Sequence, residues 1–138
     1  EYKHPKELID WSTLYAFVDF VVNSDDATFR STYSQKIDVP NMLDYFIFMN
    51  LIRAVDNRGK NLYLAKYKKG EPYFYVPWDL DATFGSFWEG SNQNVYNDLL
   101  FNGLYSRLWQ DPAFRVQLSE RWSELRNSVV SKEKIGEC

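Results

Sequence analysis

Residues 38–61 read DVPNMLDYFIFMNLIRAVDNRGKN and join the clearest helix signal of the chain to a polar turn. Asp38 can cap a helix, and Pro40 suits its first turn, because proline lacks an amide hydrogen that would be unpaired there. Residues 42–55 are apolar on nearly every side, which predicts a helix inside the domain rather than on its surface. The polar residues 56–61 then predict a turn that is held by the most buried element.

Two more helices are predicted upstream of this stretch. Residues 7–22 carry apolar side chains at steps of three and four, and residues 24–26 offer a cap and two acids for the first turn of the next helix. The apolar face expected for residues 7–22 consists of Leu8, Trp11, Leu14, Tyr15, Val18, Val21 and Val22.

Downstream, residues 62–67 and 73–76 are rich in β-forming side chains and flank a Lys-Gly turn, which predicts a β-hairpin. Helical patterns return at residues 95–108 and again from Asp111-Pro112, a cap followed by proline. The predicted fold is therefore α+β and mostly helical, with a central hairpin, in a single domain that spans residues 1–138.

Composition excludes several classes of protein. A content of 45% hydrophobic and 18% aromatic residues excludes a disordered or low-complexity chain, and a net charge of -3 gives no basic field for nucleic acid. The longest apolar run, residues 45–52, is far too short for a membrane span. The single cysteine, Cys138, excludes an intrachain disulfide and a zinc site built on cysteines. Because the chain lacks an initiating Met and ends abruptly, we expect it to be part of a longer protein.

The turn contains Asp56-x-Arg58-x-x-Asn61, which is the spacing of a kinase catalytic loop. There the aspartate accepts the proton of the substrate hydroxyl and the asparagine holds a magnesium ion. Asp79 arrives 23 residues after Asp56, where protein kinases place the metal-binding aspartate of Asp-Phe-Gly, and the hairpin would return it to the same cleft. The sequence therefore predicts a site for a hard cation.

Each residue also has a simpler interpretation. Asp56 is a common turn former, Asn61 could cap a strand, and Arg58 could be a solvated charge. Asp79 and Asp81 could point to opposite faces or cap backbone amides. Only the order of the motifs along the chain favours a shared site.

Residues 37–45, 56–64, 77–81 and 83–85 together resemble the CotH kinase family, which is named after spore coat protein H. The resemblance implies an atypical protein-kinase-like fold and ATP-dependent phosphorylation of a protein substrate. It also implies ATP with Mg²⁺ or Mn²⁺ as cofactors, a nucleotide and a protein as partners, and a location in the spore coat, the cell envelope or outside the cell.

Carried over to this chain, the resemblance makes Asp56 the catalytic aspartate and Asn61 and Asp79 ligands of the metal. Asp81 belongs to the same Trp-Asp-x-Asp motif, as a second ligand or as a group that orients the loop. Arg58 would contact the transferred phosphate.

A kinase also needs a glycine-rich cover and a lysine-bearing strand, whereas the first glycine here is Gly59. We therefore expect a protein-kinase-like C-terminal lobe without the lobe that grips ATP, and no turnover by this chain alone. Two alternatives are a non-catalytic pseudokinase or aromatic-rich binding module of a bacterial envelope protein, and a metal-dependent phosphohydrolase that uses Asp79 and Asp81. The phosphohydrolase ranks last, since it needs more ligands or a nucleophile.

Most of the aromatic residues near the hairpin are predicted to be core, with Trp88 expected to be exposed and His4 expected to have no role in the chemistry. These aromatic residues are Tyr63, Tyr67, Tyr73, Phe74, Tyr75, Trp78, Phe84, Phe87 and Trp88.

Overall fold

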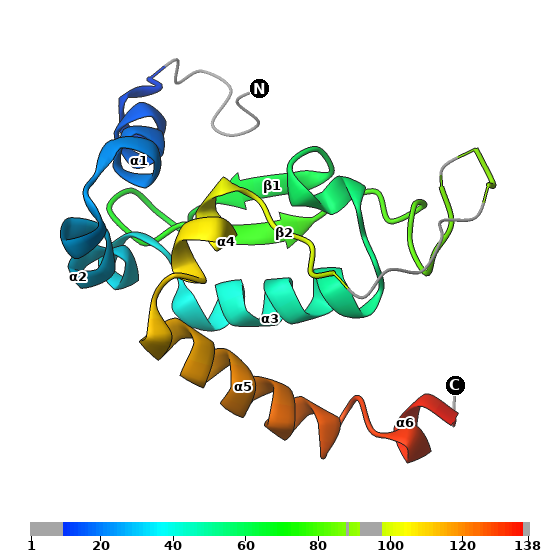
Figure 1. Cartoon of the computed structure of the whole chain (residues 1–138). Helices are drawn as coiled ribbons and strands as arrows, with labels where there is room; N and C mark the ends of the chain where they lie inside the picture. The colour runs from blue at the N-terminus through cyan, green and yellow to red at the C-terminus, as the bar shows by residue number, and fades with distance from the viewer. Residues whose placement is uncertain (1–9, 88, 92–97, 137–138) are drawn as a thin grey trace.

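The computed structural model describes residues 10–87, 89–91 and 98–136. Its elements are, in order, α1 (Ser12–Asn23), α2 (Asp26–Lys36), α3 (Val39–Leu51), the short 3-10 helix η1 (Asp56–Arg58), β1 (Leu62–Ala65), β2 (Phe74–Pro77), α4 (Gly103–Leu108), α5 (Pro112–Arg126) and α6 (Lys132–Gly136). Helix α3 lies at the centre, with the strands on one side and α5 on the other (Figure 1). The predicted α+β fold, mostly helical with an antiparallel hairpin, is confirmed.

Helix α3 begins as predicted, because the Asp38 carboxylate accepts the Asn41 backbone N–H at 3.0 Å. Six of its side chains are buried: Met42, Leu43, Tyr45, Phe46, Ile47 and Met49. The helix ends at Leu51 and not at residue 55. Arg53 there adopts a left-handed φ of 53°, and the Ala54 N–H donates to the Met49 carbonyl, which closes the helix and turns the chain.

The hairpin has the predicted topology, with Leu62 opposite Pro77 and Ala65 opposite Phe74. Asn41 of α3 fixes β2 from its free side, since its carboxamide accepts the Tyr75 N–H at 2.8 Å and donates to the Tyr75 carbonyl at 3.1 Å. The strands are thereby held on the central helix.

The predicted apolar face of α1 is only partly confirmed: Leu14 and Val21 are half-buried, and Leu8 lies outside the described residues. Tyr15 is 70% exposed and Val22 67% exposed, whereas Phe17 is buried against Tyr73, with ring centroids 4.6 Å apart. Apolar side chains occur on several sides of α1, so periodicity alone admits more than one face. Contact with α2 and α4 selects the face that carries Phe17.

The helix predicted at residues 95–108 is confirmed only from residue 103 onward. Residues 95–97 lie outside the described part of the chain, and residues 98–102 are not helical. The Asn50 side chain accepts the Leu100 N–H at 2.7 Å and donates to the Leu100 carbonyl at 3.4 Å. These bonds to α3 replace the helical bonds of Leu100, so α4 begins only at Gly103.

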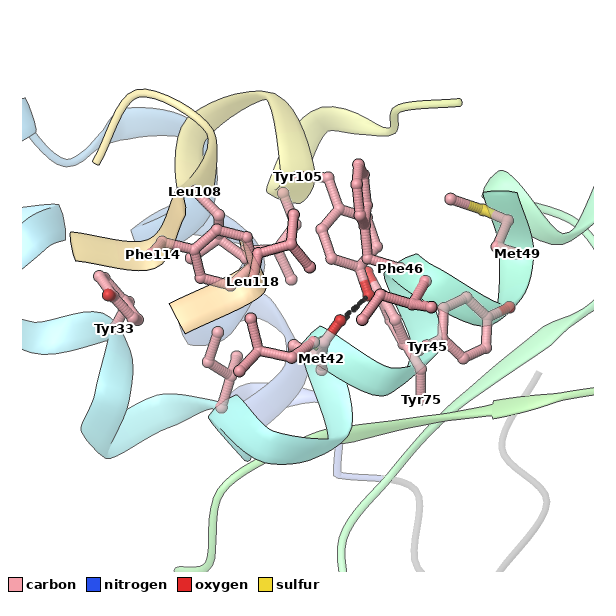
Figure 2. Packing of buried hydrophobic residues seen from close by; sticks show 14 of the residues in the cluster. Tyr33, Met42, Tyr45, Phe46, Met49, Tyr75, Tyr105, Leu108, Phe114 and Leu118 are labelled. Carbon is pink, nitrogen blue, oxygen red and sulfur yellow. Dashed lines mark hydrogen bonds between the residues drawn. The ribbon is translucent and has the colours of Figure 1, made fainter. Parts of the chain in front are cut away.

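The core is one cluster of buried side chains to which α3, α1, α2, β2, α4 and α5 all contribute. Figure 2 shows Tyr105 among these side chains, with its hydroxyl donating to the Met42 carbonyl at 2.8 Å. Asp111 caps α5 as predicted by accepting the Ala113 N–H, and its other carboxylate oxygen accepts the buried Tyr33 hydroxyl at 2.9 Å. A polar bond therefore ties α2 to the start of α5.

The hydrogen bond between Tyr33 and Asp111 should make the free energy of unfolding depend on pH in the alkaline range. Burial, together with the Asp111 carboxylate, raises the pKa of Tyr33 from 10 to about 12. Below pH 10 both the folded and the unfolded chain keep this proton. Between pH 10 and 12 the unfolded chain loses it first, so the free energy of unfolding should fall as pH rises through this window.

Urea titrations at pH 8 and pH 11.5 measure this loss of stability. Tyr33→Phe, which cannot ionise, should reduce the difference between the two pH values. Tyr15→Phe is the control, because Tyr15 is 70% exposed and should leave the difference at its wild-type size. Equal behaviour of the two variants would contradict the prediction.

Candidate functional site

The two predicted motifs lie in turns that are hydrogen-bonded to each other at one end of the hairpin. The first turn spans residues 56–61 and precedes β1, and the second spans residues 78–81 and follows β2. The Trp78 N–H donates to the Asn61 carbonyl at 2.9 Å, and the Asn61 side chain donates to the Asp79 carbonyl at 3.3 Å. The antiparallel register explains this meeting, because Leu62 pairs with Pro77 immediately before the turns.

Asp56 is the first residue of the first turn, and its backbone carbonyl is the acceptor that closes this turn. Its carbonyl accepts the N–H groups of Gly59, Lys60 and Asn61, which places Asp56 and Asn61 at the two ends of one compact loop. The Asp56 carboxylate is about one-third exposed and accepts the Lys60 ammonium at 3.3 Å. This cation is itself mostly exposed, so the pair is weak and the carboxylate remains accessible.

The amide of Asn61 has a defined orientation. Because its nitrogen donates to the Asp79 carbonyl, the side-chain oxygen is the end that remains for another partner. That oxygen has no hydrogen bond to any residue that the structure describes. Asn61 therefore presents a free acceptor beside the second turn.

Asp79 and Asp81 are exposed, and their carboxylates accept no hydrogen bond from the residues described here. Asp79 adopts a left-handed φ of 52°, a conformation that aspartate tolerates better than most residues. Beyond them the loop is fastened to the end of α3, where the Phe84 N–H donates to the Ile52 carbonyl at 2.6 Å and Ala82 is buried. Both carboxylates are thus carried by a backbone that is held at both ends.

Arg58 is exposed, and its Nε donates to the Val55 carbonyl at 3.1 Å. Its own carbonyl accepts the side chain of Asn102 at 2.9 Å, which ties the first turn to the start of α4. The terminal nitrogens of the guanidinium have no partner within the described residues. Arg58 can therefore still offer two donor groups to an anion.

Sequence reasoning missed Asn57, which is 1% exposed. Its side-chain nitrogen donates to the Asn61 carbonyl at 2.5 Å and to the Trp78 carbonyl at 2.9 Å, so one carboxamide contacts both turns. The Tyr45 hydroxyl donates to the Asn57 carbonyl at 2.9 Å from below. A polar residue inside a polar turn gives no pattern that separates it from its solvated neighbours, so no sequence signal indicated this role.

The prediction that most of the aromatic residues near the hairpin are core is wrong for the described residues. Tyr73 and Tyr75 are buried, but Tyr67 is 80%, Phe84 78% and Trp78 58% exposed. A two-stranded sheet has too little area to cover so many rings, and the loop after β2 lies at the edge of the fold (Figure 1). Trp88 and His4 lie outside the described residues.

The donor chemistry at the two turns fits a magnesium-like ion. In residues 10–87, 89–91 and 98–136 no group of three or more His, Cys, Asp or Glu side chains could hold a metal ion. Mg²⁺ does not need such a cluster, because proteins bind it through one or two carboxylates and the phosphates of the substrate complete its shell. One amide oxygen and two carboxylates that accept no hydrogen bond from the described part of the chain are donors of this kind.

No helix within the described ranges is both long and apolar enough to cross a membrane. Comparison with protein families gives one finding: the family model described as CotH kinase protein matches residues 1–137. No curated protein and no solved structure matches the chain. The match covers essentially the whole sequence and confirms the resemblance noted for residues 37–85, so the chain belongs to the CotH kinase family.

Proposed function

We propose that this chain is the phosphoryl-transfer lobe of a CotH-type kinase, which moves the γ-phosphoryl group of ATP to a hydroxyl of a protein substrate. The observation that carries the proposal is the pair of hydrogen bonds from Trp78 to Asn61 and from Asn61 to Asp79. These bonds place the amide of the first turn beside the aspartate of the second, as the kinase-like spacing requires. Membership of the CotH family supports the same reaction.

In the proposed mechanism Asp56 acts as the general base. Its accessible carboxylate would take the proton of the substrate hydroxyl as that oxygen bonds to the γ-phosphorus, while the bond from the γ-phosphorus to the bridging oxygen breaks and ADP leaves. The weak pair with Lys60 leaves the carboxylate able to accept this proton. Arg58 would contact the transferred phosphoryl group through its terminal nitrogens. Both residues belong to the same turn, so one fixed loop would position base and cation together.

Asn61 and Asp79 would hold Mg²⁺, or Mn²⁺ in its place, with Asp81 as a further ligand or as a group that orients the loop. The bound ion neutralises charge on the phosphates and orients them for an in-line transfer. These side chains supply oxygen donors that accept no hydrogen bond from the described residues, and their backbone is held by the bonds between the two turns.

A protein-kinase-like C-terminal lobe explains why no part of this sequence resembles a glycine-rich phosphate cover. The first glycine, Gly59, already lies within the catalytic turn. We expect the 138-residue chain alone to transfer no phosphate from [γ-³²P]ATP, while the complete protein does so. Turnover by the isolated chain would contradict this division into lobes.

A non-catalytic binding module is the second candidate, and the exposed rings favour it. Tyr67, Trp78 and Phe84 present more aromatic surface to solvent than a small domain normally leaves uncovered. Calorimetry with Mg-ATP on the complete protein, together with a glycan array, separates the two candidates. Binding of glycans without binding of Mg-ATP would favour the module.

Asp79→Asn tests the proposed metal site. Asparagine keeps the volume and tolerates the left-handed backbone, so far-UV circular dichroism and the free energy of unfolding should stay unchanged. The affinity for Mn²⁺ should fall by at least about 100-fold, because even loss of an outer-shell partner costs 10- to 100-fold. Transfer of ³²P from ATP by the complete protein should fall with it.

Glu120→Gln is the matched control for Asp79→Asn. Glu120 is exposed on α5, and its side chain forms no hydrogen bond or ion pair with the described residues. Helix α5 lies on the far side of α3 from the hairpin (Figure 1). The control should keep both the Mn²⁺ affinity and the transfer rate. Wild-type affinity and rate in Asp79→Asn would remove Asp79 from the mechanism.

A further inference from the structure

Asn57 stands out because its side chain is buried while the turn that carries it is polar. Among the described residues, Asn57 and Asp111 are the buried polar or charged ones. Burying a carboxamide is costly unless its hydrogen bonds are satisfied. Both donors of Asn57 are satisfied by backbone carbonyls, and those carbonyls belong to the two turns of the candidate site.

The two bonds fix the parts of the backbone that orient Asn61 and Asp79. The Trp78 carbonyl and the Asp79 nitrogen belong to the same planar peptide group. The hydrogen bond from Asn57 to this carbonyl therefore fixes the orientation of the peptide group that precedes the Asp79 Cα. The left-handed φ of Asp79 is less stable than an ordinary one and persists only where neighbouring contacts impose it. The Asn61 carbonyl accepts both the Asn57 side chain and the Trp78 N–H, which closes the first turn onto the second.

Asn57 is in turn anchored to the central helix. The Tyr45 hydroxyl donates to its carbonyl at 2.9 Å, and its own N–H donates to the Ala54 carbonyl at 3.1 Å. Tyr45 is itself buried and packs on Tyr75 of β2, with ring centroids 5.1 Å apart. Figure 2 shows these two rings close together in the core. A continuous path of contacts therefore runs from α3 through Asn57 to both turns.

We infer that Asn57 is the positioning residue of the site: its buried carboxamide locks the turn of residues 56–61 to the turn of residues 78–81 and thereby sets Asn61 and Asp79 for one cation. Its side-chain donors are spent on protein carbonyls, so it acts through the two ligand-bearing turns. The inference rests on the proposed function for the identity of the ligands. The lock itself rests on the hydrogen bonds alone.

The test compares Asn57→Ala with Asn41→Ala on the full chain. Asn41 is a matched control, because it also gives its carboxamide to the backbone of another element, at Tyr75, yet contacts neither turn. Both variants lose stability, as urea titration will show. Only Asn57→Ala should weaken Mn²⁺ binding, measured by the electron paramagnetic resonance signal of the free ion, by about 10- to 100-fold.

Hydrogen exchange gives a second readout that needs no metal. The Trp78 N–H should exchange faster in Asn57→Ala than in Asn41→Ala at matched stability, because the lock that covers its bond to Asn61 is gone. If Asn57→Ala does not fold, Tyr45→Phe removes only the hydroxyl beneath Asn57 and should weaken Mn²⁺ binding in the same direction, by less. Wild-type Mn²⁺ affinity in a folded Asn57→Ala variant would overturn the inference.

Asp79→Asn distinguishes failure of this inference from failure of the proposed function. If Asp79→Asn loses Mn²⁺ binding but Asn57→Ala does not, the proposed metal site is retained and only the positioning role of Asn57 is overturned. Equal Mn²⁺ affinity of the wild type and Asp79→Asn overturns the metal site, and with it the positioning of ligands. The exchange rate of the Trp78 N–H then still decides whether Asn57 locks the turns.

Discussion

Changing Asp56 to asparagine should lower the kcat of phosphoryl transfer by the complete protein by about 10²- to 10⁴-fold, the usual contribution of a general base. The variant keeps the shape of the side chain and the carbonyl that closes the turn, so the fold should persist. KM for ATP should stay near its wild-type value, because the proton is taken only in the transition state. Initial rates over a range of ATP concentrations measure both constants.

Lys60→Met is the control for Asp56→Asn. Either change removes the ion pair between Asp56 and Lys60, but only Asp56→Asn removes the base. Because the ammonium is mostly exposed, its loss should change kcat little. Equal losses of kcat in the two variants would assign the effect to the ion pair, and wild-type kcat in Asp56→Asn would refute the role of Asp56.

The starts of α3 and α5 are the part of the fold that the sequence predicts best. Asp38 and Asp111 cap these helices as predicted, each accepting a backbone N–H two or three residues ahead at 3.0 Å, whereas α2 is capped by Asp25 and not by Ser24. Such bonds join near neighbours in the chain, so a local pattern contains them. The hairpin is predictable for a similar reason, since its two strands are neighbours along the chain and both are rich in β-forming side chains.

The errors arise where a distant residue decides the local structure. Leu100 leaves the predicted helix because Asn50, fifty residues away, takes both of its backbone groups. The face of α1 is selected by Tyr73 and by the helices around it, and not by its own periodicity. Long-range hydrogen bonds and packing override propensity in both cases, and neither partner can be identified from local patterns.

In the candidate site too, local features of the sequence are predictable and long-range contacts are not. The spacing from Asp56 to Asn61 and the hairpin between the motifs predict that the two turns meet, and they do meet, through Asn61 and Trp78. The bond from Asn57 to Trp78 joins residues 21 positions apart through one carboxamide, and no periodicity or motif encodes it. Sequence reasoning thus finds the proposed ligand residues more readily than a buried residue that hydrogen-bonds both of their turns.

Replacing Phe46 by alanine should cost about 3–5 kcal/mol of the free energy of unfolding, the usual range for a buried phenylalanine. Phe46 is 3% exposed, and its ring centroid lies 4.9 Å from that of Tyr105 and 5.5 Å from that of Phe101. It also lines an open surface pocket of about 550 Å³ to which α3 and α5 contribute. Truncation would enlarge this space, and the surrounding rings are too rigid to fill it.

Urea unfolding of Phe46→Ala, followed by tryptophan fluorescence, measures the loss. Phe87→Ala is the control, since Phe87 is 40% exposed and its removal should cost far less. A loss in Phe46→Ala no larger than in the control would mean that α3, α4 and α5 do not share one core. Because α3 also carries Tyr45, which supports Asn57, such a result would leave the two turns without a rigid foundation.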